Sequence, residues 1–467
     1  MKTGRRHFLK LAAAVSLGFV GLHRYFASAS FRETGLYRRL KGYGHLRAKS
    51  GRVIDLPEGF SCNVISTTGE EMNDGFLVPA RHDGMAAFLG PEGKTIVIRN
   101  HEMNQDIAGS GGPYGLENEL FGRLGPGEAY DNGKGASRCK GGTTTLVYDT
   151  KNQRLESHYL SLAGTLRNCA GGPTPWNSWI TCEETVDRAG ELLEKDHGYN
   201  FEVPASAEPV RTKPFAFTEM GRFRHEAVAV DPESGIVYQT EDQSDGLIYR
   251  FIPNKLGEFA YGGRLQALVI GGTKGRDTRN WSEGTLFPVG KPETVEWIDM
   301  DNVESPDDDL RLRGFEMGAA RFARGEGMWY GRGAVYFACT NGGVDRHGQI
   351  WRYIPSPFEG TEGENEKPGA LELFLEPNDS NLLEMADNLT VAPWGDIIAC
   401  EDGSGEQFIV GITQKGKLYK IGHNALNSSE FAGVTFSPDG STLFVNIQTP
   451  GLTLAITGPW ESLYNDH

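Results

Sequence analysis

Two stretches of the chain open with a residue of a type that can bind a metal ion and end with closely spaced carboxylates. Cys169 opens the stretch CAGGPTPWNSWITCEE, which ends on Glu183 and Glu184, and Glu226 opens the stretch EAVAVDPESGIVYQTED. Carboxylate oxygens suit hard cations such as Ca²⁺, and a thiolate among them suits a transition metal. A metal site, a disulfide between Cys169 and Cys182, and plain strand packing are all consistent with the first stretch alone.

The elements that hold these residues repeat along the chain. In each, a polar or reactive residue opens a short strand, a turn rich in Pro, Gly and Asp follows, and an apolar strand ends on a polar pair. The runs cover residues 84–102, 169–184, 226–242, 326–341, 388–402 and 433–447, the first of them fitting more loosely. No long segment with helical periodicity appears after the N-terminal region.

Repeated antiparallel hairpins predict an all-β fold, a six-bladed β-propeller with insertions between blades, preceded by an N-terminal export signal. A large β-sandwich is the competing fold. The insertions are expected at 104–140, 299–309 and 357–369. The predicted domains are a signal peptide at 1–29, an N-terminal arm at 30–50 and the propeller domain at 51–467.

In a hairpin, the start of the first strand and the end of the second lie at the same edge. The polar ends should therefore gather at one end of the central channel. The predicted ring contains Glu102, Cys169, Glu183, Glu184, Glu226, Glu241, Asp242, Glu326, Thr340, Asn341, Asn388, Glu401 and Asp402. Carboxylates that close together stay ionised only when cations neutralise them, so the ring predicts bound metal ions.

The cysteines divide into two groups. Cys182, Cys339 and Cys400 occupy the same strand position in three repeats and are most simply small core residues. Cys169 instead opens a strand where other repeats have Glu or Asn, which favours a ligand role. A bridge between Cys169 and Cys182 would join opposite ends of one hairpin, which disulfide geometry disfavours. Cys62 and Cys139 carry no clear signal.

The first residues resemble an export leader. Arg5 and Arg6 precede an apolar run that is too short to span a bilayer, and a small-residue cleavage site follows before residue 30. The pattern predicts export through the twin-arginine translocase to the periplasm or outside the cell. That route carries folded proteins, often with a cofactor already loaded.

The net charge of the full chain is −16, and the leader contributes only positive residues, so the mature chain is more acidic still. Such a surface disfavours binding to nucleic acid or to an anionic membrane. A monomer is the default expectation, because a closed propeller has no free sheet edges.

Several motifs, in order, resemble the PhoX-type alkaline phosphatases over most of the mature chain. They are IRNHE (98–102), RNCAGGPTPWNSWITCEE (167–184), GRFRHEAVAVDP (221–232), ARGEG (323–327), DNLTVAPWGDIIACEDG (387–403) and the final AGVTFSPDGSTLFVNIQTPG. The resemblance implies a six-bladed propeller with a cluster of ferric and calcium ions, Fe(3+) and Ca(2+), and hydrolysis of phosphate monoesters.

Site residues follow from the same resemblance. Cys169 matches a bridging thiolate, Glu184 and Glu226 match cluster carboxylates, and Arg324 and Glu326 match an Arg-x-Glu pair that holds phosphate and metal. Further calcium or outer ligands are expected at Glu102, Glu183, Asp242, Asp387, Asn388, Glu401 and Asp402.

Three residues near these motifs have a functional and a structural reading. Arg167 can contact phosphate, or it can form a salt bridge to the ring. His101 and His225 can act at the site by orienting a ligand or donating a proton, or they can serve the core.

The sequence predicts an exported metal-dependent phosphatase whose partner is a small phosphate ester. A calcium-dependent hydrolase of another ester class, such as a lactonase or a phosphodiesterase, and a non-catalytic binding propeller are the alternatives. The absence of a G-x-S-x-G motif argues against a serine hydrolase.

Overall fold

The structure is a computed structural model that describes residues 40–48, 51–105, 111–135, 137–281 and 286–463. The predicted export signal at 1–29 and most of the predicted arm at 30–50 lie outside these residues. No helix among the described residues has the length and apolar character needed to cross a membrane.

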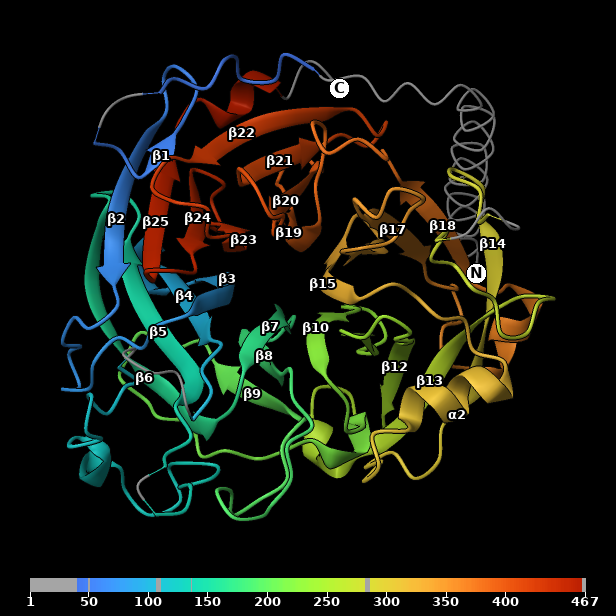
Figure 1. Cartoon of the computed structure of the whole chain (residues 1–467), viewed down its shortest axis with the longest axis horizontal. Helices are drawn as coiled ribbons and strands as arrows, with labels where there is room; N and C mark the ends of the chain where they lie inside the picture. Colours follow the sequence, from blue (N-terminus) through green and yellow to red (C-terminus); the bar gives the residue numbers. More distant parts are fainter. Residues whose placement is uncertain (1–39, 49–50, 106–110, 136, 282–285, 464–467) are drawn as a thin grey trace, which may run out of the picture.

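Six inner strands surround the centre of the molecule (Figure 1). They are β3 (His82–Leu89), β7 (Asn168–Pro173), β10 (His225–Val230), β15 (Gly325–Gly331), β19 (Ala386–Val391) and β23 (Phe431–Phe436). Each contacts the next in chain order, and β23 contacts β3, so the ring closes.

Each inner strand pairs antiparallel with the strand that follows it, as the six predicted hairpins require. The second strands are β4 (Thr95–His101), β8 (Ser178–Glu183), β11 (Val237–Glu241), β16 (Ala334–Cys339), β20 (Ile397–Glu401) and β24 (Thr442–Ile447).

Further strands extend these hairpins outwards. They are β5 (Gly141–Asp149), β6 (Arg154–Thr165), β9 (Asn200–Pro204), β12 (Ile248–Pro253), β13 (Gly263–Ile270), β14 (Glu293–Asp299), β17 (Gln349–Ile354), β18 (Ala370–Leu375), β21 (Phe408–Ile412), β22 (Leu418–Asn424) and β25 (Leu452–Thr457). Two N-terminal strands, β1 (Ile54–Asp55) and β2 (Ser61–Thr67), pair with β22 and β25, which ties the two ends of the ring together (Figure 1).

Helices are few among the described residues. One α-helix, α2 (Leu310–Met317), and short 3₁₀ turns occupy the connections. The turns are Pro91–Gly93, Phe121–Arg123, Thr218–Met220, Phe259–Tyr261, Glu362–Glu366 and Trp460–Leu463.

The all-β, propeller-like arrangement is therefore confirmed, but the described strands form five sheets and not six. One sheet has nine strands because β14 pairs with β13 along most of its length and also with β18 through Glu293 and Thr294. This short contact merges two neighbouring meanders that the sequence predicts as separate blades.

The core lies between neighbouring sheets. Cys182, Cys339 and Cys400 are fully buried within three apolar clusters of this core, in line with their expected packing role. All six cysteines are free thiols, so Cys169 and Cys182 form no disulfide.

Glycines allow the inner strands to approach each other closely. A Cβ atom on Gly172 of β7 would lie 2.0 Å from the carbonyl oxygen of Val228 in β10. A side chain at this position would push two backbones of the ring apart.

We therefore expect Gly172→Ala to lower the free energy of unfolding by about 1–3 kcal/mol, the usual cost of overpacking. Gly405→Ala is the matched control, because a Cβ there meets no atom within 4 Å. Urea unfolding followed by fluorescence measures both. Equal midpoints for Gly172→Ala and the wild type would contradict the close packing of β7 and β10.

Candidate metal centre

A backbone irregularity repeats where each inner strand begins. The first residue of an inner strand pairs with the last residue of the second strand, for example His225 with Glu241, and the register then shifts before Val228. The same shift follows His82, Asn168, Gly325 and Ala386 in four other inner strands. Such bulges re-aim the side chain that they contain.

In five inner strands, the residue directly after that first pair has a side chain of a type that can bind a metal ion. These residues are Asp83, Cys169, Glu226, Glu326 and Asp387. In the sixth, Ala432 takes the corresponding place and offers no ligand atom. The hairpin repeat and its bulge therefore direct four carboxyl groups and one thiol to the same end of the ring.

A second repeated contact places further side chains at this end. The backbone N–H just past each second strand donates to a carbonyl two residues before the bulge position, as Glu184 does to Arg167 at 2.9 Å. The donors are Glu102, Glu184, Asp242, Thr340, Asp402 and Gln448, and the acceptors are Arg81, Arg167, Arg224, Arg324, Met385 and Glu430. Each hairpin thus presents three positions, and we call the surface they form the rim.

Two groups of rim residues have ligand atoms within 4.8 Å of one another. One joins Cys169, Glu184 and Glu226, and the other joins Glu226, Glu326 and Asp387. Glu226 belongs to both.

The Glu226 carboxylate tests whether a cation fits this site. The side chain is fully buried, and neither of its oxygens has a hydrogen-bond partner among the described residues. Leaving a buried carboxylate without partners is costly, and a bound cation removes that cost. The site therefore fits metal ions, with hard oxygen donors for calcium and one sulfur donor for a transition metal.

The pKa values of the rim carboxyl groups are raised, so these groups favour a bound proton unless a cation neutralises them. Burial raises the pKa of Glu184 to about 8, although Arg167 opposes the shift. Burial and the neighbouring Asp402 raise the pKa of Asp387 to about 7. The pKa values of Glu226 and Glu326 lie well above the usual range because both groups are buried beside other carboxylates. Burial, with Asp83 and Glu226 nearby, also raises the pKa of the Cys169 thiol.

Two arginines stand among these acids. Arg324 donates from Nε and Nη2 to the Asp242 carboxylate at 2.7 and 3.0 Å, and from Nη2 to Glu326 at 2.7 Å. Arg167 donates from Nη2 to Glu184 at 2.5 Å, and the same nitrogen lies 2.9 Å from a Glu102 carboxylate oxygen, so the structure contains the salt bridge considered for Arg167.

Both arginines have left-handed backbones, with φ of 51° for Arg324 and 46° for Arg167. Such conformations cost energy in residues other than glycine, and they persist where the surrounding structure enforces them. Each side chain is about one-third exposed, at 30% and 34%. The two guanidinium groups are thus held in place while still facing solvent.

Two of the predicted ligands bond other parts of the protein. The Glu183 carboxylate accepts bonds from the Leu166 N–H and from the His197 ring. The Glu401 carboxylate accepts bonds from Lys420 and from the Glu384 N–H. These two side chains occupy paired strand positions, whereas the residue after each one reaches the rim, because successive strand residues point to opposite sides.

Asn388 has structural partners as well. Its amide oxygen accepts the Gly433 N–H at 2.6 Å, and its nitrogen donates to Asp387 at 3.1 Å. It therefore links β19 to β23 and orients the Asp387 carboxylate, and its role as a ligand stays a prediction.

The sequence prediction missed two rim acids, Asp83 and Glu430. Burial and the neighbouring carboxylates Glu102 and Asp387 raise the pKa of Asp83, and burial with Asp402 and Asp387 raises that of Glu430. A signal for Asp83 was available, because Arg-His-Asp at 81–83 matches Arg-His-Glu at 224–226.

The two histidines with open readings, His101 and His225, serve the core. His101 contacts the Ala80 carbonyl at 2.9 Å and the Thr144 hydroxyl at 2.8 Å, and His225 contacts the Gly221 carbonyl at 2.9 Å. Burial lowers the pKa of both rings, to about 3 for His225, so both are neutral. Of their two readings, the structure favours the structural one.

An open pocket adjoins the rim. Its lining includes Arg167 and Glu184 together with a further cation, Arg224. The remaining lining residues are Asn104, Gln105, Leu166, Thr185 and Asp187. The buried Glu184 lines this pocket together with Arg167 and Arg224, so an anionic ligand there could contact these two arginines and a cation held by Glu184.

Comparison with known proteins gives one family. The family profile described as alkaline phosphatase PhoX matches residues 41–451. No relative was found among curated protein sequences.

One of the solved structures found shares the fold at low sequence identity. The structure of Pseudomonas fluorescens PhoX in complex with vanadate, a transition state analogue, is 16% identical with a TM-score of 0.63, covering 89% of this chain and 97% of that one. A gluconolactonase from Xanthomonas campestris is 10% identical with a TM-score of 0.39, covering 89% of this chain and 100% of that one.

The raised pKa values predict how the stability of metal-free protein depends on pH. For Glu184, the pKa rises from about 4.5 in the unfolded chain to about 8 in the folded chain. Between these values the unfolded chain has released a proton that the folded chain still holds. The free energy of unfolding should therefore fall as the pH rises through this range, by up to about 1.4 kcal/mol per unit of pKa shift.

Urea unfolding in EDTA at about pH 5 and about pH 8 measures this fall. Glu184→Gln should make the unfolding free energy depend less steeply on pH. Glu191→Gln, at an exposed position, is the control that should leave this dependence unchanged. A stability that rises with pH over the same range would contradict a buried, charge-crowded rim.

Proposed function

The chain belongs to the family of PhoX alkaline phosphatases, and we propose on this basis that it hydrolyses phosphate monoesters to release inorganic phosphate. The observation that carries the proposal is the position of Arg324. Its guanidinium lies beside Glu326, which shares a ligand group with Glu226 and Asp387. A cation-binding group thus lies next to a side chain that recognises phosphate well.

Arg324 has capacity left for a substrate. Its Nε and Nη2 atoms bond Asp242 and Glu326, and Nη1 makes no hydrogen bond to a described residue. Arginine commonly binds phosphate through two parallel N–H groups. We propose that Arg324 binds the phosphate group and stabilises the charge that develops as the ester bond breaks, and that Arg167 gives a second contact.

We propose that the rim holds iron and calcium. Cys169, Glu184 and Glu226 would hold Fe(3+), since this group contains the thiol, and Glu226, Glu326 and Asp387 would hold Ca(2+) or share the iron. Glu102, Asp242 and Asp402 are proposed as further calcium ligands. Bound there, these cations supply positive charge to phosphate oxygens.

Two of these proposed calcium ligands also hold the arginines. The Asp242 carboxylate fixes Arg324, and Glu102 fixes Arg167. Cation binding would draw Glu326 and Glu184 towards the metals, and each arginine would keep one carboxylate partner and gain bonding capacity for phosphate.

We further propose that the nine-stranded sheet counts as two blades, which gives a six-bladed propeller formed by residues 51–467. The leader pattern at 1–29 supports export by the twin-arginine translocase to the periplasm or beyond. We propose a monomer, because the inner strands form a closed ring. We also propose that it associates stably with neither membranes nor nucleic acid, because the chain is acidic.

Hydrolysis of p-nitrophenyl phosphate by exported protein tests the proposal. EGTA should abolish hydrolysis and added calcium should restore it, because the rim acids need cations to stay ionised. Folded, metal-loaded protein that releases no p-nitrophenol would contradict the proposal. Hydrolysis of a lactone or a phosphodiester instead would assign the site to another ester class.

Arg324→Ala should lower kcat/KM for p-nitrophenyl phosphate by about 10²–10³-fold, the usual cost of removing one donor to a developing negative charge. Arg324→Lys should recover only part of this loss, because lysine keeps the charge and lacks the paired donors. Arg264→Ala is the control, since that side chain is half exposed and pairs with Asp299. Equal losses for Arg324→Ala and Arg264→Ala would exclude the proposed phosphate contact.

A further inference from the structure

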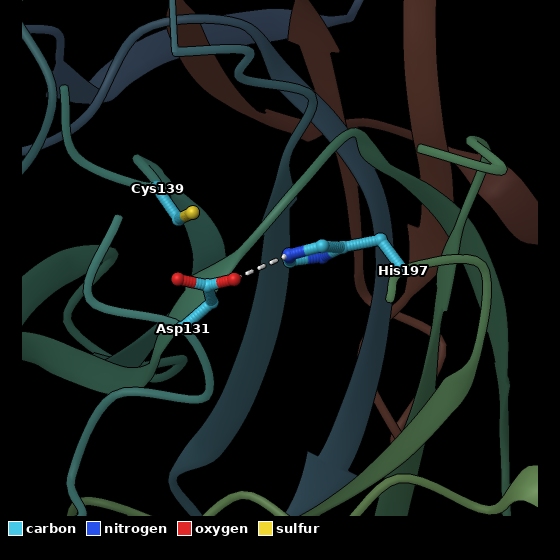
Figure 2. Close-up of side chains that lie close together, drawn as sticks. All are labelled: Asp131, Cys139 and His197. Atoms are coloured by element: carbon cyan, nitrogen blue, oxygen red, sulfur yellow. Dashed lines mark hydrogen bonds and ion pairs between the residues drawn. The ribbon is translucent and has the colours of Figure 1, made fainter. Parts of the chain in front are cut away.

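A second cluster of potential ligands lies away from the rim groups. Asp131, Cys139 and His197 are all fully buried, and their ligand atoms lie within 4.8 Å of one another (Figure 2). Asp131 and Cys139 come from the long connection between β4 and β5, and His197 comes from the connection between β8 and β9. The cluster therefore joins two loops that are distant in sequence.

The His197 ring is oriented as metal-binding histidines usually are. Nδ1 lies 2.6 Å from the Glu183 carboxylate, and Nε2 lies 3.3 Å from Asp131. Glu183 is itself fixed, because it also accepts the backbone N–H groups of Leu166 and Gly198. A carboxylate on one ring nitrogen holds the ring and makes the other nitrogen a better ligand.

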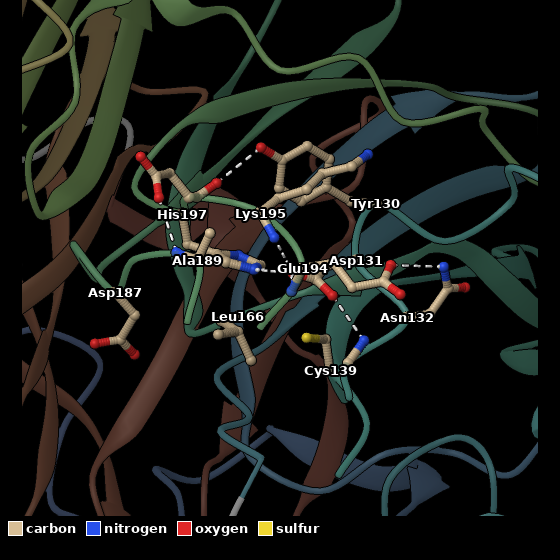
Figure 3. Close-up of polar contacts among 12 residues, drawn as sticks. Tyr130, Asp131, Asn132, Cys139, Leu166, Asp187, Ala189, Glu194, Lys195 and His197 are labelled. Atoms are coloured by element: carbon tan, nitrogen blue, oxygen red, sulfur yellow. Dashed lines mark hydrogen bonds and ion pairs between the residues drawn. The ribbon is translucent and has the colours of Figure 1, made fainter. Parts of the chain in front are cut away.

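Asp131 is held by backbone donors. Its Oδ2 accepts the N–H groups of Glu194 and Lys195, both at 2.8 Å, and its Oδ1 accepts that of Gly133 at 2.6 Å (Figure 3). Although burial opposes the shift, bonds from His197 and Gly133 lower the pKa of Asp131, so the carboxylate is ionised. A buried negative charge thus faces the thiol and the imidazole.

Cys139 completes the group. Its side chain is enclosed by Leu166 and Leu193, and the Gln105 amide nitrogen lies 3.6 Å from its sulfur. This position differs from those of Cys182, Cys339 and Cys400, which lie on strands within large apolar clusters.

We propose that Asp131, Cys139 and His197 form a second metal site, for a divalent cation of the zinc class. One oxygen, one sulfur and one imidazole nitrogen are the donor types that zinc accepts, and it binds them at about 2.0–2.3 Å. Ligand atoms up to 4.8 Å apart need to move by only about 1 Å to reach such a cation. The Gln105 amide can offer its oxygen as a fourth ligand after rotation.

Binding exchanges protons for the cation. The Cys139 thiol releases its proton to solvent, and the His197 Nε2 proton that now faces Asp131 also leaves, so the three side chains bind as thiolate, neutral imidazole and carboxylate. No oxidant or reductant takes part.

The site would be structural, and it lies next to elements that carry the rim. Glu183 precedes the rim residue Glu184, and Leu166 precedes Arg167. The bond from the Leu166 N–H to Glu183 joins the two segments at 2.9 Å. A cation on His197 would therefore fasten the connection between β4 and β5 to the strands that present Arg167 and Glu184.

Cobalt titration of the full chain tests the site without using phosphatase activity. Co²⁺ replaces zinc and gives a sulfur-to-cobalt charge-transfer absorption when a thiolate binds it. The Cys169→Ser variant is titrated, because this removes the rim thiol. We expect the absorption to appear in Cys169→Ser. It should also appear in the control, Cys169→Ser combined with Cys182→Ser, and it should be absent from Cys169→Ser combined with Cys139→Ser.

Circular dichroism of each variant establishes that it is folded. If the variant carrying Cys139→Ser does not fold, a second measurement replaces it. Proton release on cobalt binding is compared between Cys169→Ser and Cys169→Ser combined with His197→Gln. The proposal expects fewer protons released by the variant that lacks His197. Folded Cys169→Ser protein with no charge-transfer absorption at saturating cobalt would overturn the proposal and leave a hydrogen-bonded network of Asp131, His197 and Glu183. Because no substrate is involved, this result is independent of whether the rim hydrolyses phosphate esters.

Discussion

Mutual repulsion among buried carboxylates is the constraint on which the rest of this structure depends. Glu226, Glu326 and Asp387 bring ligand atoms within 4.8 Å of one another, and burial raises the pKa of each. Two arginines offset part of this charge through Glu326 and Glu184, but the Glu226 oxygens have no partner among the described residues. Protons or cations must supply the balance. The energy stored by this crowding is available to hold metal ions at the rim.

The backbone of the inner strands brings these carboxylates close together. A register shift at the start of the strand turns one residue in each of five inner strands towards the same end, and a backbone bond two residues earlier fixes the loop that precedes it. Close glycine contacts, such as Gly172 against Val228, bring neighbouring strands near enough for ligands from different blades to meet. A site assembled from many short strands is rigid because each ligand belongs to a hydrogen-bonded sheet.

Much of this could be predicted from the hairpin repeat, and the failures have local causes. The repeat indicates which end of each strand carries the polar residues, so Cys169, Glu184 and Glu226 were found. It does not distinguish neighbouring residues at a strand end, so Glu183 and Glu401 were assigned to the ring together with Glu184 and Asp402, although their carboxylates bond His197 and Lys420.

Residues outside the repeat were harder to predict. Glu430 stands where four other hairpins have arginine and one has Met385, and this departure from the pattern hid it. Asp131, Cys139 and His197 meet only through the packing of long loops, which no spacing in the sequence reveals. Metal analysis by mass spectrometry of purified, folded wild type and Glu226→Gln protein tests the central claim most directly. The account predicts several cations bound to the wild type and a clear loss in Glu226→Gln, since Glu226 belongs to both ligand groups. A folded wild type that is free of metal and still hydrolyses phosphate esters would contradict it.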